Sequence, residues 1–196
     1  MLYKVACFAV RWYYRIFFFA GITGIENLPK EGGFALCANH KSNNDPPIIA
    51  ALIKKQINFL SKKELLDVPV LGAFVKKVGA IPIDRDKKDI SAIKESLRVM
   101  REGKGLMVFP QGTRMKKITP ESVKPGILSM AHKAGVPVVP VGIAGEYRLF
   151  GRVRVNIGAP ITVEEIGEIL KIEDRDKMNS ELSNLLYTRI KELAGE

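Results

Sequence analysis

The sequence predicts an α/β fold in which a mixed, largely parallel sheet is flanked by helices and preceded by an amphipathic N-terminal helix. From Phe34 onward, short apolar runs alternate with segments of helical periodicity, a pattern typical of parallel strands covered by helices. The chain has 196 residues, of which 46% are hydrophobic and 27% charged, as expected for one globular domain with a substantial core. An aromatic-rich segment precedes this alternating region.

That segment, residues 2–22, contains eight aromatic side chains, but Lys4, Arg11 and Arg15 interrupt its apolar run. No stretch is therefore long enough to span a bilayer, and at helical spacing the three cations share one narrow face. We predict that residues 1–22 form an interfacial membrane helix with its cations toward anionic lipid. A helix packed on its own domain is the alternative, while the arginines argue against a signal peptide.

The elements of the body follow from periodicity and from glycine and proline positions. Helices are expected around residues 46–54, 90–100, 125–134 and 178–193, and Gly135 is suited to end the third of them. The prolines of residues 136–143 favour an edge strand or the start of a strand. Strands are expected at residues 34–38, 57–61, 79–83, 105–109, 136–143 and 153–158.

Charge and cysteine content restrict the partners and the compartment. The net charge of +10 and the pI of about 9.6 favour a negatively charged partner such as anionic lipid or an acidic protein. No zinc finger, helix-turn-helix or aromatic RNA-binding pattern is present in the sequence, which argues against nucleic acid. The only two cysteines make no disulfide framework, so a reduced, cytosolic setting is predicted. The sequence leaves the oligomeric state open.

The first candidate motif is NHKSNNDP, residues 39–46, directly after the predicted strand 34–38. A neutral imidazole accepts a proton near pH 7, and it does so better when a carboxylate holds its other ring nitrogen. His40 is therefore a candidate general base and Asp45 its orienting partner. Asp45 also precedes two prolines, as the N-cap of a helix would, and one carboxylate could serve both roles.

Two other chemistries are less well supported by this motif. Ser42 lacks the glycines of a nucleophile elbow, so a covalent serine mechanism is disfavoured. His40, Asp45 and the distant His132 do not supply the ligand set of a metal site, and no metal is expected. His132 falls within a predicted helix and is more typical of a packing or surface histidine.

The second candidate motif is FPQGTR, residues 109–114, after the predicted strand 105–109. Gly112 would let backbone N–H groups approach an anion, Thr113 adds a hydroxyl, and Arg114 offers a guanidinium matched to phosphate. Since ligands bind at the carboxyl ends of parallel strands, we expect both motifs to line one site. Further candidate cations are Arg85 and Lys62, with Lys124 a weaker one.

Four segments resemble, in order, the conserved blocks of the 1-acylglycerol-3-phosphate acyltransferase (PlsC-type) family. NHKSNNDP resembles its NHxSxxDP block, with the H-x4-D pattern, and FPQGTR resembles its FPEGTR block. GAIPIDRD, residues 79–86, resembles the arginine-bearing block between them, and VPVVPVGI, residues 136–143, resembles the proline-containing fourth block. The resemblance covers about residues 24–160.

The resemblance implies a membrane-associated acyltransferase domain over residues 23–196. It would transfer an acyl chain from a thioester to the sn-2 hydroxyl of lysophosphatidate, giving phosphatidate. His40 would be the general base, with Asp45 orienting it, and attack would be direct, without an acyl-enzyme. Arg114, Arg85 and Lys62 would hold the phosphate.

Other expectations follow from the same resemblance. Gly112 and Thr113 would shape the acceptor pocket, and Gln111 would contact the acceptor. No cofactor is expected, since the acyl donor, acyl carrier protein or acyl-CoA, is a substrate. The protein would lie on the cytoplasmic face of the cell membrane.

One departure from the family pattern concerns Gln111, where the family has glutamate. Glutamine keeps its hydrogen-bonding capacity but carries no charge, so a binding role survives and a role as charged acid or base does not. A non-catalytic lipid-binding protein of the same fold, and an acyltransferase for another lysolipid or for glycerol 3-phosphate, therefore remain alternatives. The resemblance also leads us to expect a helix pair at the membrane where only one helix is visible.

Overall fold

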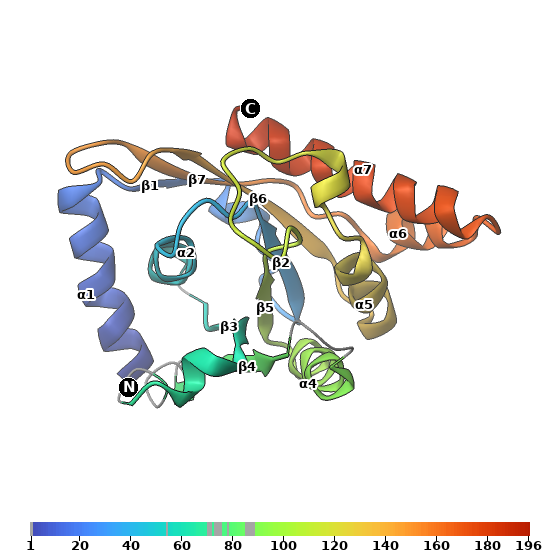
Figure 1. Cartoon of the computed structure of the whole chain (residues 1–196), viewed down its shortest axis with the longest axis horizontal. Coiled ribbons are helices and arrows are strands. Elements are labelled where there is room, and N and C mark those ends of the chain that lie inside the picture. Colours follow the sequence, from blue (N-terminus) through green and yellow to red (C-terminus); the bar gives the residue numbers. More distant parts are fainter. Residues whose placement is uncertain (1, 54, 70–71, 73–75, 78, 85–88) are drawn as a thin grey trace.

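The computed structural model describes residues 2–53, 55–69, 72, 76–77, 79–84 and 89–196 (Figure 1). A seven-stranded sheet has the order β1-β7-β6-β2-β5-β3-β4. Only the β6–β7 pair is antiparallel, and the other five pairs are parallel, which confirms the predicted mixed, largely parallel sheet. The strands are β1 Gly21–Thr23, β2 Phe34–Ala38, β3 Ile57–Lys62, β4 Ala80–Ile83, β5 Gly105–Val108, β6 Val138–Gly145 and β7 Val153–Ile157.

Helices cover both faces of the sheet, as Figure 1 shows. Strand β2 illustrates why, because every residue in it is buried and alternate side chains enter different cores. Phe34 and Leu36 pack with the core under α1 and α2, whereas Ala35 and Cys37 pack with the core under the other helices. These helices are α1 Leu2–Phe17 and α2 Asp45–Leu52 on one face, and α4 Ile90–Arg101, α5 Gly126–Ala134, α6 Val163–Leu170 and α7 Arg175–Ala194 on the other.

The N-terminal helix is shorter than residues 1–22, because α1 ends at Phe17 and residues 21–23 pair with β7. Its inner face is packed on the domain: Tyr14 is buried, and Arg11 Nε donates to the carbonyl of Ala51 at 2.6 Å. The alternative of a helix packed on its own domain is thus confirmed for this face. The expectation that Arg11 faces outward is wrong, since that guanidinium bonds to the end of α2.

The outer face of α1 remains exposed, and its contact with a membrane stays a prediction. Within the described part of the chain, no helix combines the length and the hydropathy needed to cross a bilayer. The structure says nothing of the side chain of Lys4.

Strand β6 lies between β2 and β7, so the first alternative drawn from its prolines, an edge strand, is wrong. The second, the start of a strand, agrees with the structure, since Pro137 directly precedes β6 and Pro140 is its third residue. The register with β7 begins at Val141, one residue after Pro140. Pro140 still accepts a hydrogen bond from Gly158 N–H through its carbonyl, at 2.9 Å. Its missing N–H falls on this same side, beyond the end of the β7 ladder, and therefore removes no bond between the paired strands.

Helices α2, α4, α5 and α7 lie where they are expected, whereas α6 was not anticipated. Gly135 ends α5 in the left-handed conformation, as predicted. The spacing of Ile90, Ile93, Leu97 and Met100 predicts an apolar face for α4. Met100 is buried, but Ile90 and Ile93 are 63% and 43% exposed. The buried face of α4 is instead formed by Ala92, Ser96, Val99 and Met100.

Candidate active site

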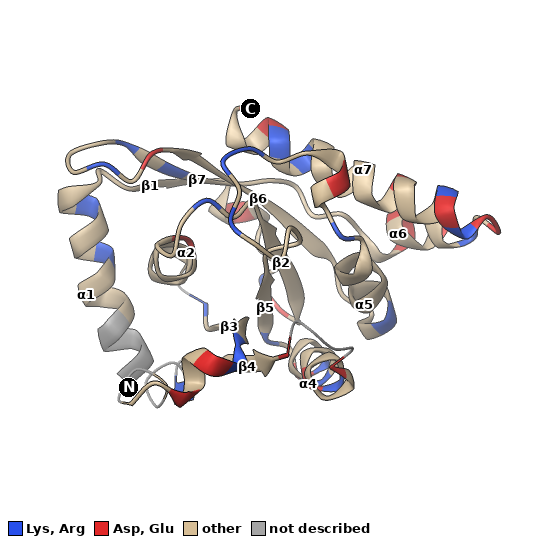
Figure 2. Cartoon of the chain, viewed as in Figure 1, with Lys and Arg blue, Asp and Glu red and all other residues tan. Residues whose placement is uncertain are grey.

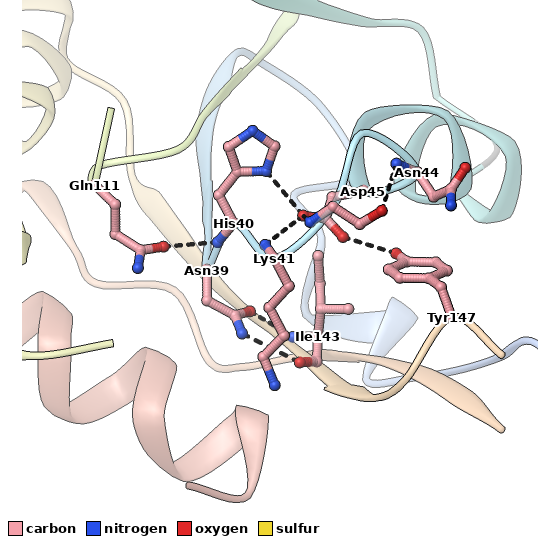
Figure 3. A network of polar contacts seen from close by, with 9 residues as sticks. Asn39, His40, Lys41, Asn44, Asp45, Gln111, Ile143 and Tyr147 are labelled. Atoms are coloured by element: carbon pink, nitrogen blue, oxygen red, sulfur yellow. Dashed lines mark hydrogen bonds and ion pairs between the residues drawn. The ribbon is translucent and has the colours of Figure 1, made fainter. Parts of the chain in front are cut away.

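His40 and Asp45 form the hydrogen-bonded pair that the sequence predicts (Figure 3). His40 Nδ1 lies 2.8 Å from Asp45 Oδ2, and the side chains are 13% and 0% exposed. Because a carboxylate only accepts, Nδ1 carries the ring proton and Nε2 keeps a free lone pair. Figure 3 shows this second nitrogen directed away from Asp45. The imidazole is therefore oriented as a general base whose other ring nitrogen is held by a carboxylate.

The Asp45 carboxylate also organises the loop that carries His40. Its Oδ2 accepts the N–H groups of Lys41 at 2.6 Å and Ser42 at 2.7 Å, and its Oδ1 accepts the hydroxyl of Tyr147 at 2.8 Å. The predicted N-cap role is wrong, because Asn44 is the N-cap and Asp45 binds N–H groups that precede the helix rather than those within it. One carboxylate does serve backbone and imidazole together, as anticipated.

Two contacts fix the position of the His40 ring and main chain. Asn39 is buried at the end of β2 and forms a paired interaction with Ile143 of β6, accepting from its N–H at 2.7 Å and donating to its carbonyl at 3.1 Å. The ring of Phe109 stacks on the imidazole with a centroid distance of 4.0 Å and an interplanar angle of 21°. Both contacts restrict the freedom of His40 before any substrate arrives.

Gln111 joins the two motifs through its side chain. Its Oε1 accepts the backbone N–H of His40 at 2.6 Å, and the side chain is buried (Figure 3). Exchanging the amide oxygen and nitrogen would set two donors against each other, so this orientation is dictated by the contact. Nε2 is buried without a hydrogen-bond partner among the described residues. Gln111 thus supports the His40 main chain, a role that needs an acceptor but no charge.

The rest of the second motif turns back toward His40. Gly112 has φ +70°, a conformation that favours glycine, and its N–H donates to the carbonyl of Phe109 at 3.0 Å. This N–H closes the turn, and the approach of an anion to the backbone of the motif stays a prediction. Thr113 and Arg114 are exposed. Met115 N–H donates to the carbonyl of His40 at 2.8 Å. Arg114 directly precedes Met115, so its main chain lies beside that of His40.

A pocket of about 330 Å³ opens beside Phe109, at the carboxyl ends of β3, β4 and β5. Its walls are mostly apolar, with Gly112 and Lys124 as well as Asp84 in the lining. Lys124 reaches over the turn of the second motif, since its Nζ lies 3.6 Å from where a Cβ on Gly112 would be. Among the described candidate cations, the one that sequence reasoning ranked as weaker, Lys124, therefore lines this pocket.

Two other candidates, Lys62 and Ser42, have local partners, and a third lies outside the described residues. Lys62 is exposed and pairs with Glu64 at 3.3 Å, and Arg85 lies outside the described residues. Ser42 accepts the N–H of Asn44 through its hydroxyl, a local structural role.

His132 and the buried Cys37 take no part in the contacts of the site. His132 lies in α5 close to Gly167 of α6, which agrees with a packing histidine. Cys37 is fully buried, and burial raises the pKa of its thiol, which disfavours a reactive thiolate. The described residues contain no cluster of three potential metal ligands.

Tyr147 is, like Phe109, a residue of this site whose role sequence reasoning missed. It lies in the connection between β6 and β7, and its ring stands 6.1 Å from Phe18 and 6.4 Å from Tyr14. Burial and the neighbouring Asp45 carboxylate raise the pKa of Tyr147, so its hydroxyl stays protonated and able to donate. Because β6 runs parallel to β2, its carboxyl end reaches the same edge of the sheet, and that rule could have pointed to this residue.

Comparison with known proteins identifies the class to which this fold and site belong. A model of the acyltransferase family matches residues 20–144, and the chain belongs to this family. The 1-acyl-sn-glycerol-3-phosphate acyltransferase of Bacillus subtilis is 31% identical over 177 residues, covering 87% of this chain and 86% of that protein. The enzyme of the same name from Streptococcus pneumoniae is 32% identical over 183 residues, covering 87% of this chain and 64% of its own length.

A solved structure gives the same result. The crystal structure of the 1-acyl-sn-glycerophosphate (LPA) acyltransferase PlsC from Thermotoga maritima is similar with a TM-score of 0.74 and 26% identity. The match covers 98% of this chain and 79% of that chain. The chain thus spans most of the B. subtilis relative but only 49% of the chloroplast LPAT1 of Arabidopsis thaliana.

Replacing Tyr147 by phenylalanine tests whether its hydroxyl positions the pair. The ring packing is kept, but a hydrogen bond to a buried carboxylate is lost, which should lower the free energy of unfolding by about 1.5–3 kcal/mol. We expect kcat for acyl transfer to fall several-fold while KM for the acceptor is unchanged. Tyr187→Phe on α7 is the matched control. Wild-type kcat and stability in Tyr147→Phe would remove the positioning role.

Replacing Gln111 separates its acceptor function from its charge. Gln111→Leu leaves the buried N–H of His40 unpaired, so unfolding should become easier by about 1–3 kcal/mol, with a matching loss of turnover. Gln111→Glu keeps an acceptor, and we expect its turnover to stay within about tenfold of wild type, less than removal of a catalytic acid or base would cost. Chemical denaturation and steady-state kinetics measure both effects. A gain in rate of a hundredfold in Gln111→Glu would show that charge, not acceptance, is what this position requires.

Proposed function

We propose that this chain transfers an acyl group from an acyl thioester to the sn-2 hydroxyl of lysophosphatidate, giving phosphatidate. The observation that carries the proposal is the contact of His40 Nδ1 with the buried Asp45 carboxylate, which leaves Nε2 as an oriented base. The family and the names of its relatives support the choice of reaction.

In the proposed reaction, the acceptor oxygen attacks the thioester carbonyl while His40 Nε2 takes the hydroxyl proton. Asp45 stabilises the imidazolium that forms, since its Oδ2 stays on Nδ1. The tetrahedral intermediate then breaks its carbon–sulfur bond, and the departing thiolate receives the proton from Nε2. No acyl-enzyme forms, in keeping with the structural role of Ser42 and the burial of Cys37.

Binding of the two substrates follows from the charges and apolar walls around His40. We assign the acceptor phosphate to Arg114, whose main chain adjoins that of His40. Thr113, Arg85 and Lys62 would add to this contact, as the family resemblance implies. The apolar pocket beside Phe109 suits a hydrocarbon segment, with Lys124 available to an anionic group. The net charge of +10 suits either acyl carrier protein or acyl-CoA as donor.

We also propose that the protein works as a peripheral protein on the cytoplasmic face of the membrane. The outward side of α1 exposes Phe8, Trp12 and Ile16, which would lie at the level of the lipid headgroups. The acceptor and the product would then be reached without leaving the bilayer surface.

The chain offers a matched pair of variants for the mechanism, because His40 and His132 are its only histidines. With lysophosphatidate and an acyl thioester, His40→Ala should lose about 10²–10⁴-fold in kcat, the usual contribution of a general base. His132→Ala should retain wild-type turnover. Mass spectrometry of the product measures both rates and, in an acceptor screen, compares lysophosphatidate with glycerol 3-phosphate and other lysolipids. Undiminished turnover in His40→Ala would contradict the mechanism, and lipid binding without turnover in wild type would favour the non-catalytic alternative.

A further inference from the structure

Large apolar side chains are exposed on two segments that are far apart in the sequence. One is the outer side of α1, where Phe8, Trp12 and Ile16 recur every four residues and are 62%, 49% and 53% exposed. The other is the connection between β6 and β7, where Leu149 and Phe150 are 58% and 61% exposed.

Direct contacts join the β6–β7 connection to the end of α1. Phe150 N–H donates to the carbonyl of Phe17 at 2.7 Å, and Val153 N–H donates to the carbonyl of Phe18 at 3.2 Å. The rings of Phe19 and Phe150 lie 6.3 Å apart. In Figure 1 the connection accordingly bends over the C-terminal end of α1. The two exposed groups therefore belong to one aromatic surface, formed by Phe8, Trp12, Tyr13, Ile16, Phe17, Phe19, Leu149 and Phe150.

The backbone at this surface holds bulky side chains where they are disfavoured. Phe19 has φ +40° and Phe150 has φ +60°, and among the described residues other than glycine these are the positive φ values. Asparagine or glycine would suit that conformation better. The two rings are also mostly exposed, so packing within the domain does not account for them. A requirement outside the domain is the physical reason that remains.

The charges around the aromatic surface indicate what covers it. Arg15 on α1, Arg148 and Arg152 on the connection, and Arg154 in the adjoining strand β7 are exposed. Figure 2 shows basic positions on the last turns of α1 and along the β6–β7 connection. Glu146 is the single acidic residue of residues 145–158, and α1 contains none. Aromatic side chains bordered by arginines match an anionic bilayer, where rings enter the headgroup region and guanidinium groups bind phosphates.

We propose that the connection between β6 and β7 is a second membrane-contacting element, in which Leu149 and Phe150 insert beside α1 into an anionic lipid surface. Tyr147 belongs to the same connection and donates to Asp45 Oδ1 at 2.8 Å. Leu149 thus lies two residues from Tyr147, which donates a hydrogen bond to the Asp45 carboxylate. The site would then lie at the bilayer surface, where a lysolipid acceptor resides. This inference rests on the proposed function in the choice of acceptor, but the lipid contact is measured without turnover.

The test combines a loop variant with a control of equal exposure. Leu149→Ser/Phe150→Asn removes the apolar groups, and asparagine suits the positive φ at position 150. Ile90→Ser is the control, because Ile90 is 63% exposed but lies on α4, on the opposite face of the sheet. Sedimentation with vesicles of equal parts phosphatidylcholine and phosphatidylglycerol measures partitioning. We expect the loop variant to partition roughly tenfold or more weakly, since two apolar side chains no longer leave water, and Ile90→Ser to match wild type.

Turnover distinguishes this inference from the proposed function. The loop variant should acylate vesicle-borne lysophosphatidate more slowly in proportion to its partitioning, yet acylate a water-soluble short-chain lysophosphatidate at the wild-type rate. Absence of turnover in wild type would refute the proposed function while partitioning still decides the lipid contact. Unchanged partitioning of the loop variant, or an equal loss in Ile90→Ser, would overturn the inference. A loss of self-association by the loop variant with unchanged partitioning would assign the surface to a second copy and would equally overturn it.

A second readout does not depend on removing side chains. Trp12 is the only tryptophan, so Trp12→Phe/Phe150→Trp reports on the loop alone. With the same vesicles we expect a blue shift of its emission and quenching by brominated lipid. Emission that stays at the aqueous wavelength would overturn the inference even if the double loop variant failed to fold.

Discussion

The buried carboxylate of Asp45 is the interaction on which the rest of the site depends. It is fully shielded from solvent, and its oxygens accept from His40 Nδ1, from the N–H groups of Lys41 and Ser42, and from the hydroxyl of Tyr147. A carboxylate in such a position is tolerated only when donors surround it, because desolvation costs several kcal/mol. The same bonds fold the loop, choose the histidine tautomer and attach the β6–β7 connection, so the structure of the loop and the chemistry of the base have one origin.

The sheet topology makes this arrangement possible. Strands β5, β2 and β6 are adjacent and parallel, so residues that follow them meet at one edge. From β2 comes His40, from β5 come Phe109 and Gln111, and from β6 comes Tyr147. His40 is the base, and Phe109 and Gln111 support its ring and its main chain. Tyr147 is the fourth donor to the Asp45 carboxylate. The packing of α1 against this edge then sets the site beside an exposed aromatic surface.

Much of this could be predicted from sequence, and the failures have physical reasons. The alternation of short apolar runs with helical segments located the strands from β2 onward. The rule that ligands bind at the carboxyl ends of parallel strands predicted that His40 and residues 109–114 lie together. The N-cap assignment of Asp45 failed because a carboxylate can bind N–H groups on either side of itself in the chain, and spacing does not say which. Tyr147 and Lys124 were missed or underrated because their roles depend on how distant segments pack. Arg11 was assigned to the lipid-facing side because periodicity gives a helix face but not which face meets α2.

The central claim is that one lysolipid headgroup bridges the imidazole of His40 and the guanidinium of Arg114. A crystal structure with bound lysophosphatidate tests it most directly. The account predicts the sn-2 hydroxyl at about 2.6–3.2 Å from His40 Nε2, with the phosphate held by Arg114. A phosphate bound away from Arg114, or a hydroxyl that does not reach Nε2, would contradict it.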